Sequence, residues 1–133
     1  MTTGKSILVV DDEAAVLFTY KLLLERNGYE PTPVVSAEQA KNALAGRPFD
    51  LMLCDLSLEE KDSGFKVIEF ARERHPGMPS ILITGYASAD AAQKAADLGV
   101  PVLYKPIDIQ ELMTTIPALL MRDTNEEAKT GTC

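Results

Sequence analysis

The chain has 133 residues, which suits one domain that buries a single core without disulfides or a structural metal. Its formal net charge of −7 argues against direct nucleic-acid binding, because the chain offers no basic surface to phosphates. With two cysteines, no signal peptide and no apolar run long enough to cross a bilayer, the protein is expected in the cytoplasm and not at a membrane.

Apolar runs alternate with stretches of helical spacing along most of the chain. In chain order we predict a strand at 7–10, a helix at 13–27, a strand at 30–35, a helix at 36–45, a strand at 51–54, a helix from 62 or 63 to 74, a strand at 81–83, a helix from 88 or 90 to about 99, a strand at 100–104 and a helix from 107 to about 120. Most of these strands are continuous apolar runs, which is typical of parallel strands covered on both faces. The exception is 30–35, where Pro31 and Pro33 favour a sheet edge because proline donates no ladder hydrogen bond. The alternation predicts an α/β fold of three layers, with a parallel five-stranded sheet between two layers of helices.

Polar residues mark several predicted boundaries. Ser36 opens a capping-box pattern, and Ser63 or Asp62 can cap the helix after the third strand. After residue 121 the apolar periodicity ends and only polar and small residues follow. The sequence therefore predicts a folded domain at 1–121 and a disordered polar tail at 122–133.

Charged and hydroxyl residues stand directly after four of the predicted strands: Asp11 and Asp12, Asp55, Thr84, and Lys105. The carboxyl ends of parallel strands meet at one edge of a sheet, and ligands bind at this edge in open α/β folds. The sequence therefore predicts a site formed by these five side chains.

The chemistry of these residues suits a phosphoryl group and a divalent cation. Three carboxylates at one edge repel one another unless a cation lies among them, and an all-oxygen site suits Mg²⁺. A threonine hydroxyl and a lysine ammonium can bind phosphoryl oxygens, and a carboxylate can accept a phosphoryl group as an acyl phosphate. Asp55 is the expected acceptor, because it is the single aspartate after a central strand. Taken singly, the five residues could be helix caps, a turn hydroxyl and an exposed lysine, but their joint placement favours a site.

In four segments the chain resembles the receiver domain of two-component response regulators. The matching segments are 9–13 (VVDDE), 54–57 (CDLS), 83–86 (ITGY) and 104–106 (YKP), and the resemblance covers about residues 5–121. It implies a flavodoxin-like sheet with strand order 2-1-3-4-5 and five helices.

The resemblance also implies a role for each residue of the site. Asp55 would be the phosphoacceptor, and Mg²⁺ would be held by Asp11, Asp12, Asp55 and the backbone carbonyl of Ser57. Thr84 and Lys105 would bind the phosphoryl oxygens.

The implied function is signalling by phosphorylation. A histidine kinase or a phosphotransfer protein would donate a phosphoryl group to Asp55 with the help of Mg²⁺, and the acyl phosphate would later hydrolyse. The protein would be a switch for contacts with a downstream protein and not a conventional enzyme, either as a stand-alone receiver or as one excised from a hybrid kinase. Weak dimerisation is a further expectation, and a scaffold that takes no phosphoryl group is the alternative function.

Two other functions on related chemistry are disfavoured by particular residues. A magnesium-dependent phosphatase that forms an aspartyl phosphate would need a second aspartate at the position of Ser57. A flavin-binding electron carrier would need a phosphate-binding loop after the first strand, where residues 11–13 are all acidic and would repel phosphate.

The loop after Asp55 departs from the family pattern. Glu59 stands where members usually have a proline, and Gly64 lies one residue later than the usual glycine. The loop is therefore longer and more acidic than usual, and its charged residues 59–62 are expected to be solvated surface.

The switch positions depart from the pattern as well. Val102 stands where many members have an aromatic switch residue, and Tyr104 lies two residues later on the same strand face. We expect Tyr104 to contribute to an output surface and the switching to be atypical. Ser57 and Tyr86 occupy positions that influence dephosphorylation in the family, so both are expected to modulate it.

Overall fold

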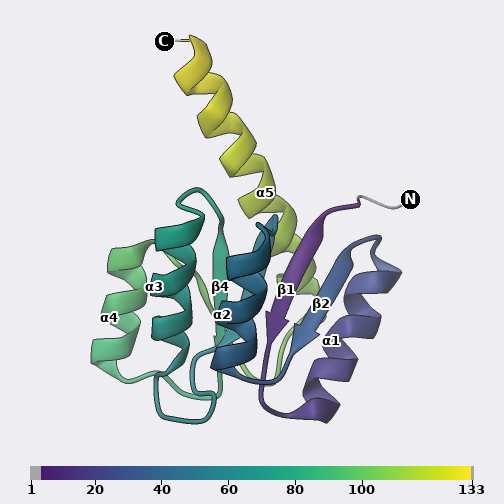
Figure 1. The fold of residues 1–133 in the computed structure, drawn as a ribbon, viewed down its shortest axis with the longest axis vertical. Coiled ribbons are helices and arrows are strands. Elements are labelled where there is room, and N and C mark those ends of the chain that lie inside the picture. The colour runs from purple at the N-terminus through teal and green to yellow at the C-terminus, as the bar shows by residue number, and fades with distance from the viewer. Residues whose placement is uncertain (1–3, 133) are drawn as a thin grey trace.

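The chain folds into alternating strands and helices, and the computed structural model describes residues 4–132, with side chains described as far as residue 121. In chain order the elements are β1 (Ser6–Val10), α1 (Ala14–Arg26), β2 (Glu30–Val34), α2 (Ala37–Gly46), β3 (Leu51–Asp55), α3 (Gly64–Arg74), β4 (Ser80–Thr84), α4 (Ala89–Leu98), β5 (Val102–Tyr104) and α5 (Ile109–Thr132). The predicted alternation of strands and helices is confirmed (Figure 1).

The strands form one parallel sheet in the order β2-β1-β3-β4-β5, which confirms the predicted strand order and fold class. β2 lies at an edge, paired with β1 from Ser6 opposite Glu30 to Val10 opposite Val34. An edge position suits the two prolines of β2, because neither has an N–H to donate to a second neighbour. β1 and β3 lie side by side in the sheet and carry the predicted aspartates at their carboxyl ends.

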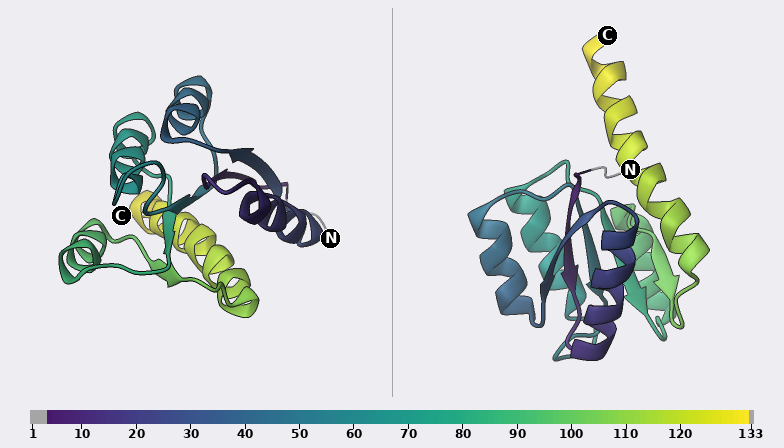
Figure 2. Two further views of the ribbon diagram at one scale, coloured as in Figure 1. Left: turned by 90° about the horizontal axis from the view of Figure 1, so that it is seen from below. Right: turned by 90° about the vertical axis from the view of Figure 1, so that its right-hand side faces the viewer.

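Helices cover both faces of the sheet (Figure 2), and alternate residues of β1 belong to the apolar clusters on opposite faces. Ile7 and Val9 belong to an apolar cluster with side chains of α1 and α5, whereas Leu8 and Val10 belong to a second cluster with side chains of α2, α3 and α4. Every residue of β3 and β4 is buried. Burial on both faces is the physical reason for the continuous apolar runs in the sequence.

Serine caps two helices, one of them at the predicted Ser36, and the predicted cap at Ser63 is absent. Ser36 and Ser88 cap α2 and α4, since each hydroxyl accepts a hydrogen bond from the backbone N–H three residues later. Ser63 precedes α3 without capping it. Its hydroxyl instead accepts from the N–H of Leu58 and donates to the carbonyl of Glu60, both in the loop after β3. The prediction of a cap was wrong because this hydroxyl braces the loop.

The last two elements differ in length from the prediction. β5 begins at Val102, because Val100 belongs to the C-terminal cap that follows α4, where its N–H donates to the carbonyl of Ala95. The backbone of α5 is helical as far as Thr132, whereas the sequence predicts a disordered tail at 122–133. The side chains from residue 122 onward lie outside the described residues, so the division at residue 121 stays a prediction. No described helix is both long and apolar enough to cross a bilayer.

Candidate functional site

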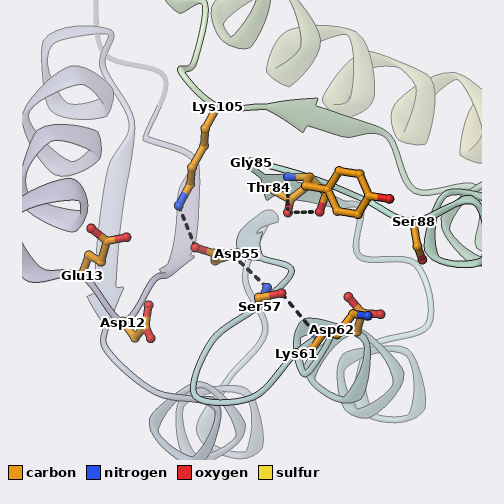
Figure 3. A pocket seen from close by; sticks show the side chains of 11 residues that line it. Asp12, Glu13, Asp55, Ser57, Lys61, Asp62, Thr84, Gly85, Ser88 and Lys105 are labelled. Atoms are coloured by element: carbon orange, nitrogen blue, oxygen red, sulfur yellow. Dashed lines mark hydrogen bonds and ion pairs between the residues drawn. The ribbon is translucent and has the colours of Figure 1, made fainter.

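The carboxyl edge of the sheet forms an open cleft of about 580 Å³. It lies where β1, β3 and β4 end and where the chain leaves β5, so the topology brings together residues up to 94 positions apart, from Asp11 to Lys105. The lining residues are Asp12, Glu13, Asp55, Ser57, Lys61, Asp62, Thr84, Gly85, Tyr86, Ser88 and Lys105 (Figure 3). The predicted convergence of polar side chains at this edge is therefore present.

Three carboxylates and one ammonium group form the centre of the site. Asp11, Asp12 and Asp55 each place a carboxylate oxygen within 4.8 Å of the others. Asp11 and Asp55 are buried, with exposed fractions of 1% and 6%, whereas Asp12 is exposed. The Nζ atom of Lys105 lies 2.8 Å from Oδ2 of Asp55 (Figure 3). The same atom lies 3.5 Å from Oδ2 of Asp11. The lysine therefore bridges the two buried carboxylates.

Backbone N–H groups hold one oxygen of each buried carboxylate. Oδ1 of Asp11 accepts from the N–H of Glu13 at 2.9 Å, and Oδ1 of Asp55 accepts from the N–H of Ser57 at 2.9 Å. These are hydrogen bonds to the second residue onward, which aspartate forms readily where a strand turns into a loop. They fix the Asp55 carboxylate at the cleft and the buried Asp11 carboxylate beside it.

The site is short of positive charge. Burial raises the pKa of the Asp11 carboxyl above its ordinary value, although the N–H of Glu13 and the charge of Lys105 act in the other direction. Burial by itself would lower the pKa of Lys105, but its hydrogen bond to Asp55 and the charges of Asp55 and Asp11 outweigh it and raise the pKa above the ordinary value. The one lysine is therefore tightly held and does not fully offset the carboxylates.

The donor set fits a hard divalent cation. Oδ2 of Asp11 is buried and accepts no hydrogen bond among the described residues, and its ion pair with Lys105 is long at 3.5 Å, so this oxygen can still bind a cation. An unsatisfied buried carboxylate oxygen costs free energy unless a cation compensates it. Carboxylate oxygens are the ligands that Mg²⁺ prefers in proteins. The cluster of Asp11, Asp12 and Asp55 is therefore a candidate metal centre.

Thr84 lies in the cleft but its hydroxyl is not bonded to the acidic cluster. The side chain is buried at the end of β4, and Oγ1 donates to the carbonyl of Tyr86 at 2.8 Å and accepts from its N–H at 3.2 Å. Both bonds lie within the loop after β4. The structure therefore brings Thr84 to the cleft with its hydroxyl engaged locally, an orientation that residue order could not predict.

The backbone at Gly64, where α3 begins, packs closely against the backbone of Asp55 and Leu56. A Cβ atom at this position would lie 2.4 Å from the carbonyl oxygen of Asp55 and 2.9 Å from the Cα of Leu56. The N–H of Gly64 donates to the carbonyl of Leu56 at 2.7 Å. Glycine is therefore required here by space, because α3 begins against the chain that carries Asp55.

The loop between β3 and α3 is solvent-exposed at residues 59–61, as expected, and it also forms part of the cleft. Lys61 and Asp62 line the cleft, and the carboxylate of Glu59 accepts a hydrogen bond from the N–H of Ala37 at the start of α2. Sequence analysis did not include these residues in the site, because a charged loop is usually solvated. Their position directly after a central strand was the available signal, since this is the edge where ligands bind.

The predicted switch and modulation residues differ in exposure. Val102 is half-buried on β5, whereas Tyr104 is 50% exposed. Tyr86 is 74% exposed and lines the cleft, and the hydroxyl of Ser57 accepts from the N–H of Asp62 at 3.2 Å. Their roles in switching and dephosphorylation stay predictions.

Comparison with known proteins connects this geometry to a family. Residues 7–117 match the family model of the response regulator receiver domain. The chain is 33% identical over 123 residues to the response regulator protein PilR of Pseudomonas aeruginosa, covering 92% of this chain and 27% of PilR. It is 38% identical over 107 residues to the alginate biosynthesis transcriptional regulatory protein AlgB of the same species, covering 80% of this chain and 24% of AlgB. The chain thus spans about a quarter of the length of these curated relatives.

A solved structure with the same fold covers nearly all of the chain. It is the CheY-like response regulator receiver domain protein from Methanospirillum hungatei, with a TM-score of 0.87 and 31% sequence identity. The superposition covers 93% of this chain and 99% of that one.

The tight packing at Gly64 predicts a large effect of a small substitution. Gly64→Ala should lower the free energy of unfolding by about 2–4 kcal/mol, because the new methyl group meets backbone atoms of Asp55 and Leu56 that have no room to move. Gly46→Ala is the matched control, since nothing lies within 4 Å of its added Cβ, and it should leave stability unchanged or raise it by about 0.5–1 kcal/mol. Urea denaturation of the three proteins measures both values, and equal stabilities for the two variants would contradict the prediction.

The bridging position of Lys105 predicts a second stability effect. In metal-free buffer, Lys105→Gln should lower the free energy of unfolding by about 1–3 kcal/mol, because it leaves Asp11 and Asp55 buried without their cation. Lys21→Gln removes an exposed ion pair with Glu25 within α1 and should cost only about 0.3–0.5 kcal/mol. Thermal or chemical denaturation with chelator present compares them, and a Lys105→Gln loss no larger than that of the control would refute the bridging role.

Proposed function

The chain belongs to the response regulator receiver domain family, and on that premise we propose that Asp55 accepts a phosphoryl group from the phosphohistidine of a histidine kinase or phosphotransfer protein. The observation that carries the proposal is the placement of Asp55. Its carboxylate lines an open cleft and is held by the N–H of Ser57 on one side and by Lys105 on the other. We place this reaction in the cytoplasm, where such donors would be met.

The chemistry needs little more than these groups. An Asp55 oxygen attacks the phosphorus, the phosphorus–nitrogen bond breaks, and its electron pair returns to the imidazole of the donor. Asp55 becomes an acyl phosphate. Lys105 Nζ, at 2.8 Å from Asp55, is close enough to follow the negative charge onto the phosphoryl oxygens. Water later attacks the phosphorus and the bond between phosphorus and the carboxyl oxygen breaks. Inorganic phosphate leaves, and the Asp55 carboxylate is regenerated.

A divalent cation would complete the site. We propose that Asp11, Asp12, Asp55 and the backbone carbonyl of Ser57 bind Mg²⁺, which would neutralise charge on the carboxylates and the phosphoryl oxygens. Support comes from the carboxylate oxygens within 4.8 Å of one another and from the buried Oδ2 of Asp11, which accepts no hydrogen bond among the described residues.

Phosphorylation would act on the rest of the domain through Thr84. A phosphoryl oxygen would compete with the Tyr86 carbonyl for the Thr84 hydroxyl, so the loop between β4 and α4 would be drawn toward Asp55. Val102 stands in place of an aromatic residue and Tyr104 is exposed on β5, so we expect an atypical switch. Its output would be a change in protein contacts at the surface around Tyr104.

Hydrolysis of the acyl phosphate would depend on two residues near Asp55. Tyr86 lines the cleft and its side chain is largely exposed, so it would limit the approach of water. Ser57 lies two residues after Asp55, and its hydroxyl is held by the N–H of Asp62. We propose that both modulate the lifetime of the phosphorylated form.

The first test is the mass of the intact protein after incubation with Mg²⁺ and acetyl phosphate. The wild type should gain one phosphoryl group, and Asp55→Asn should gain none, because the amide cannot form the acyl phosphate. A phosphoryl group on the Asp55→Asn variant would contradict the assignment of the acceptor. No gain by the wild type with either acetyl phosphate or a phosphorylated histidine kinase would refute the proposed function.

The metal proposal predicts stabilisation by Mg²⁺. At a free Mg²⁺ concentration of 100 times Kd, the wild type should gain about 2.7 kcal/mol of stability by mass action. Asp12→Asn should lose most of this gain while folding normally without metal, because Asp12 is exposed and the carboxylate is a proposed ligand. Melting temperature against Mg²⁺ concentration measures both proteins. Equal shifts in the two would exclude Asp12 as a ligand.

A further inference from the structure

The loop between β3 and α3 brings a second basic residue to the Asp55 cleft. Among the lining residues, Asp12, Glu13, Asp55 and Asp62 are acidic and only Lys61 and Lys105 are basic. An anionic phosphodonor that enters the cleft therefore meets more negative than positive charge. Repulsion of this kind lowers the rate of encounter unless a cation near the entrance offsets it.

Before transfer, Lys105 does not offset the repulsion of the donor, because its ammonium group is already paired with the carboxylates of Asp55 and Asp11. Its Nζ atom lies 2.8 Å from Asp55 and 3.5 Å from Asp11, and only 26% of the side chain is exposed. Lys61, in contrast, is exposed and lines the cleft, and its side chain makes no ion pair or hydrogen bond with any residue in the range 4–121. Lys61 is thus the lining cation whose charge stays available to an incoming anion.

The loop around Lys61 has a defined conformation. Hydrogen bonds on both sides of this residue join Asp62 N to Ser57 Oγ at 3.2 Å, Leu58 N to Ser63 Oγ at 3.1 Å, Ser63 Oγ to Glu60 O at 2.8 Å, and Ala37 N to a Glu59 carboxylate oxygen at 3.0 Å. Asp62 adopts the left-handed region, with a φ of 58°, which turns the chain directly after Lys61. Ser57 bonds to both sides of this connection, since its hydroxyl accepts from the N–H of Asp62 and its own N–H donates to the carboxylate of Asp55. The position of Lys61 is therefore coupled to that of the acceptor.

We propose that Lys61 is a donor-binding residue, whose ammonium group binds the phosphoryl oxygens of the anionic phosphodonor at the entrance to the Asp55 cleft. The inference rests on the proposed function and adds a second basic contact, after Lys105, to the phosphoryl group. Lys61 and Lys105 then act in sequence, since Lys61 attracts the donor and Lys105 follows the charge that develops on the transferred group. The charged loop is therefore part of the site.

The test is the rate at which acetyl phosphate phosphorylates the protein, followed by intact mass. At low ionic strength, Lys61→Gln should lower the second-order rate constant on the order of threefold to tenfold, because the steering charge is lost. Lys61→Arg should keep most of the rate, since it keeps the charge. Lys66→Gln is the matched control, because Lys66 is exposed on α3 and does not line the cleft, and its rate should equal that of the wild type.

Two further readouts separate donor binding from a structural role. The difference in the phosphorylation rate constant between the wild type and Lys61→Gln should become smaller as the salt concentration is raised to about 1 M, where charges are screened within about 3 Å. The melting temperature and the Mg²⁺ midpoint should be the same in both proteins. A Lys61→Gln rate equal to that of Lys66→Gln, with the wild type phosphorylated, would overturn the inference and leave the acceptor role of Asp55 intact. Absence of phosphorylation in every protein, with acetyl phosphate and with a phosphorylated histidine kinase as donor, would overturn both.

Discussion

The forced proximity of Asp11 and Asp55 is the constraint on which the site depends. Parallel pairing of β1 with β3 brings the two strand ends together, and apolar packing on both faces of the sheet removes water from their carboxylates. Lys105 reaches both from the end of β5 and offsets part of the repulsion. The same packing that stabilises the sheet therefore creates an acidic centre with a deficit of positive charge, which suits a divalent cation and a lysine-bound phosphoryl group.

A second constraint is steric and lies beneath this centre. Gly64 lets α3 begin in contact with the backbone of Asp55 and Leu56, and the preceding loop is braced by the hydroxyls of Ser57 and Ser63. The chain turns directly after Lys61, where Asp62 adopts the left-handed region. Acceptor, loop and the start of α3 thus form one packed unit, so the charged loop can take part in the chemistry of the cleft.

Features of the fold that leave a periodic pattern, or a fixed position relative to a strand, could be predicted from the sequence. Buried parallel strands need continuous apolar runs, so the sheet and the residues at its carboxyl edge could be predicted. Side-chain orientation could not. A serine before a helix looks the same whether it caps the helix or, like Ser63, braces a loop, and residue order does not reveal that the hydroxyl of Thr84 is bonded to Tyr86. Lys61 was missed because loop conformation leaves no periodic pattern.

The most direct test of the phosphoacceptor site is a crystal structure with Mg²⁺ and beryllofluoride, which mimics a phosphoryl group. We expect beryllium bonded to an Asp55 carboxylate oxygen, with Lys105 Nζ and Thr84 Oγ1 contacting its fluorides and the Thr84 bond to the Tyr86 carbonyl broken. An Asp55 that stays unmodified at saturating beryllofluoride, or a Thr84 that keeps its bond to Tyr86 when Asp55 carries the mimic, would contradict the central role given to this constellation.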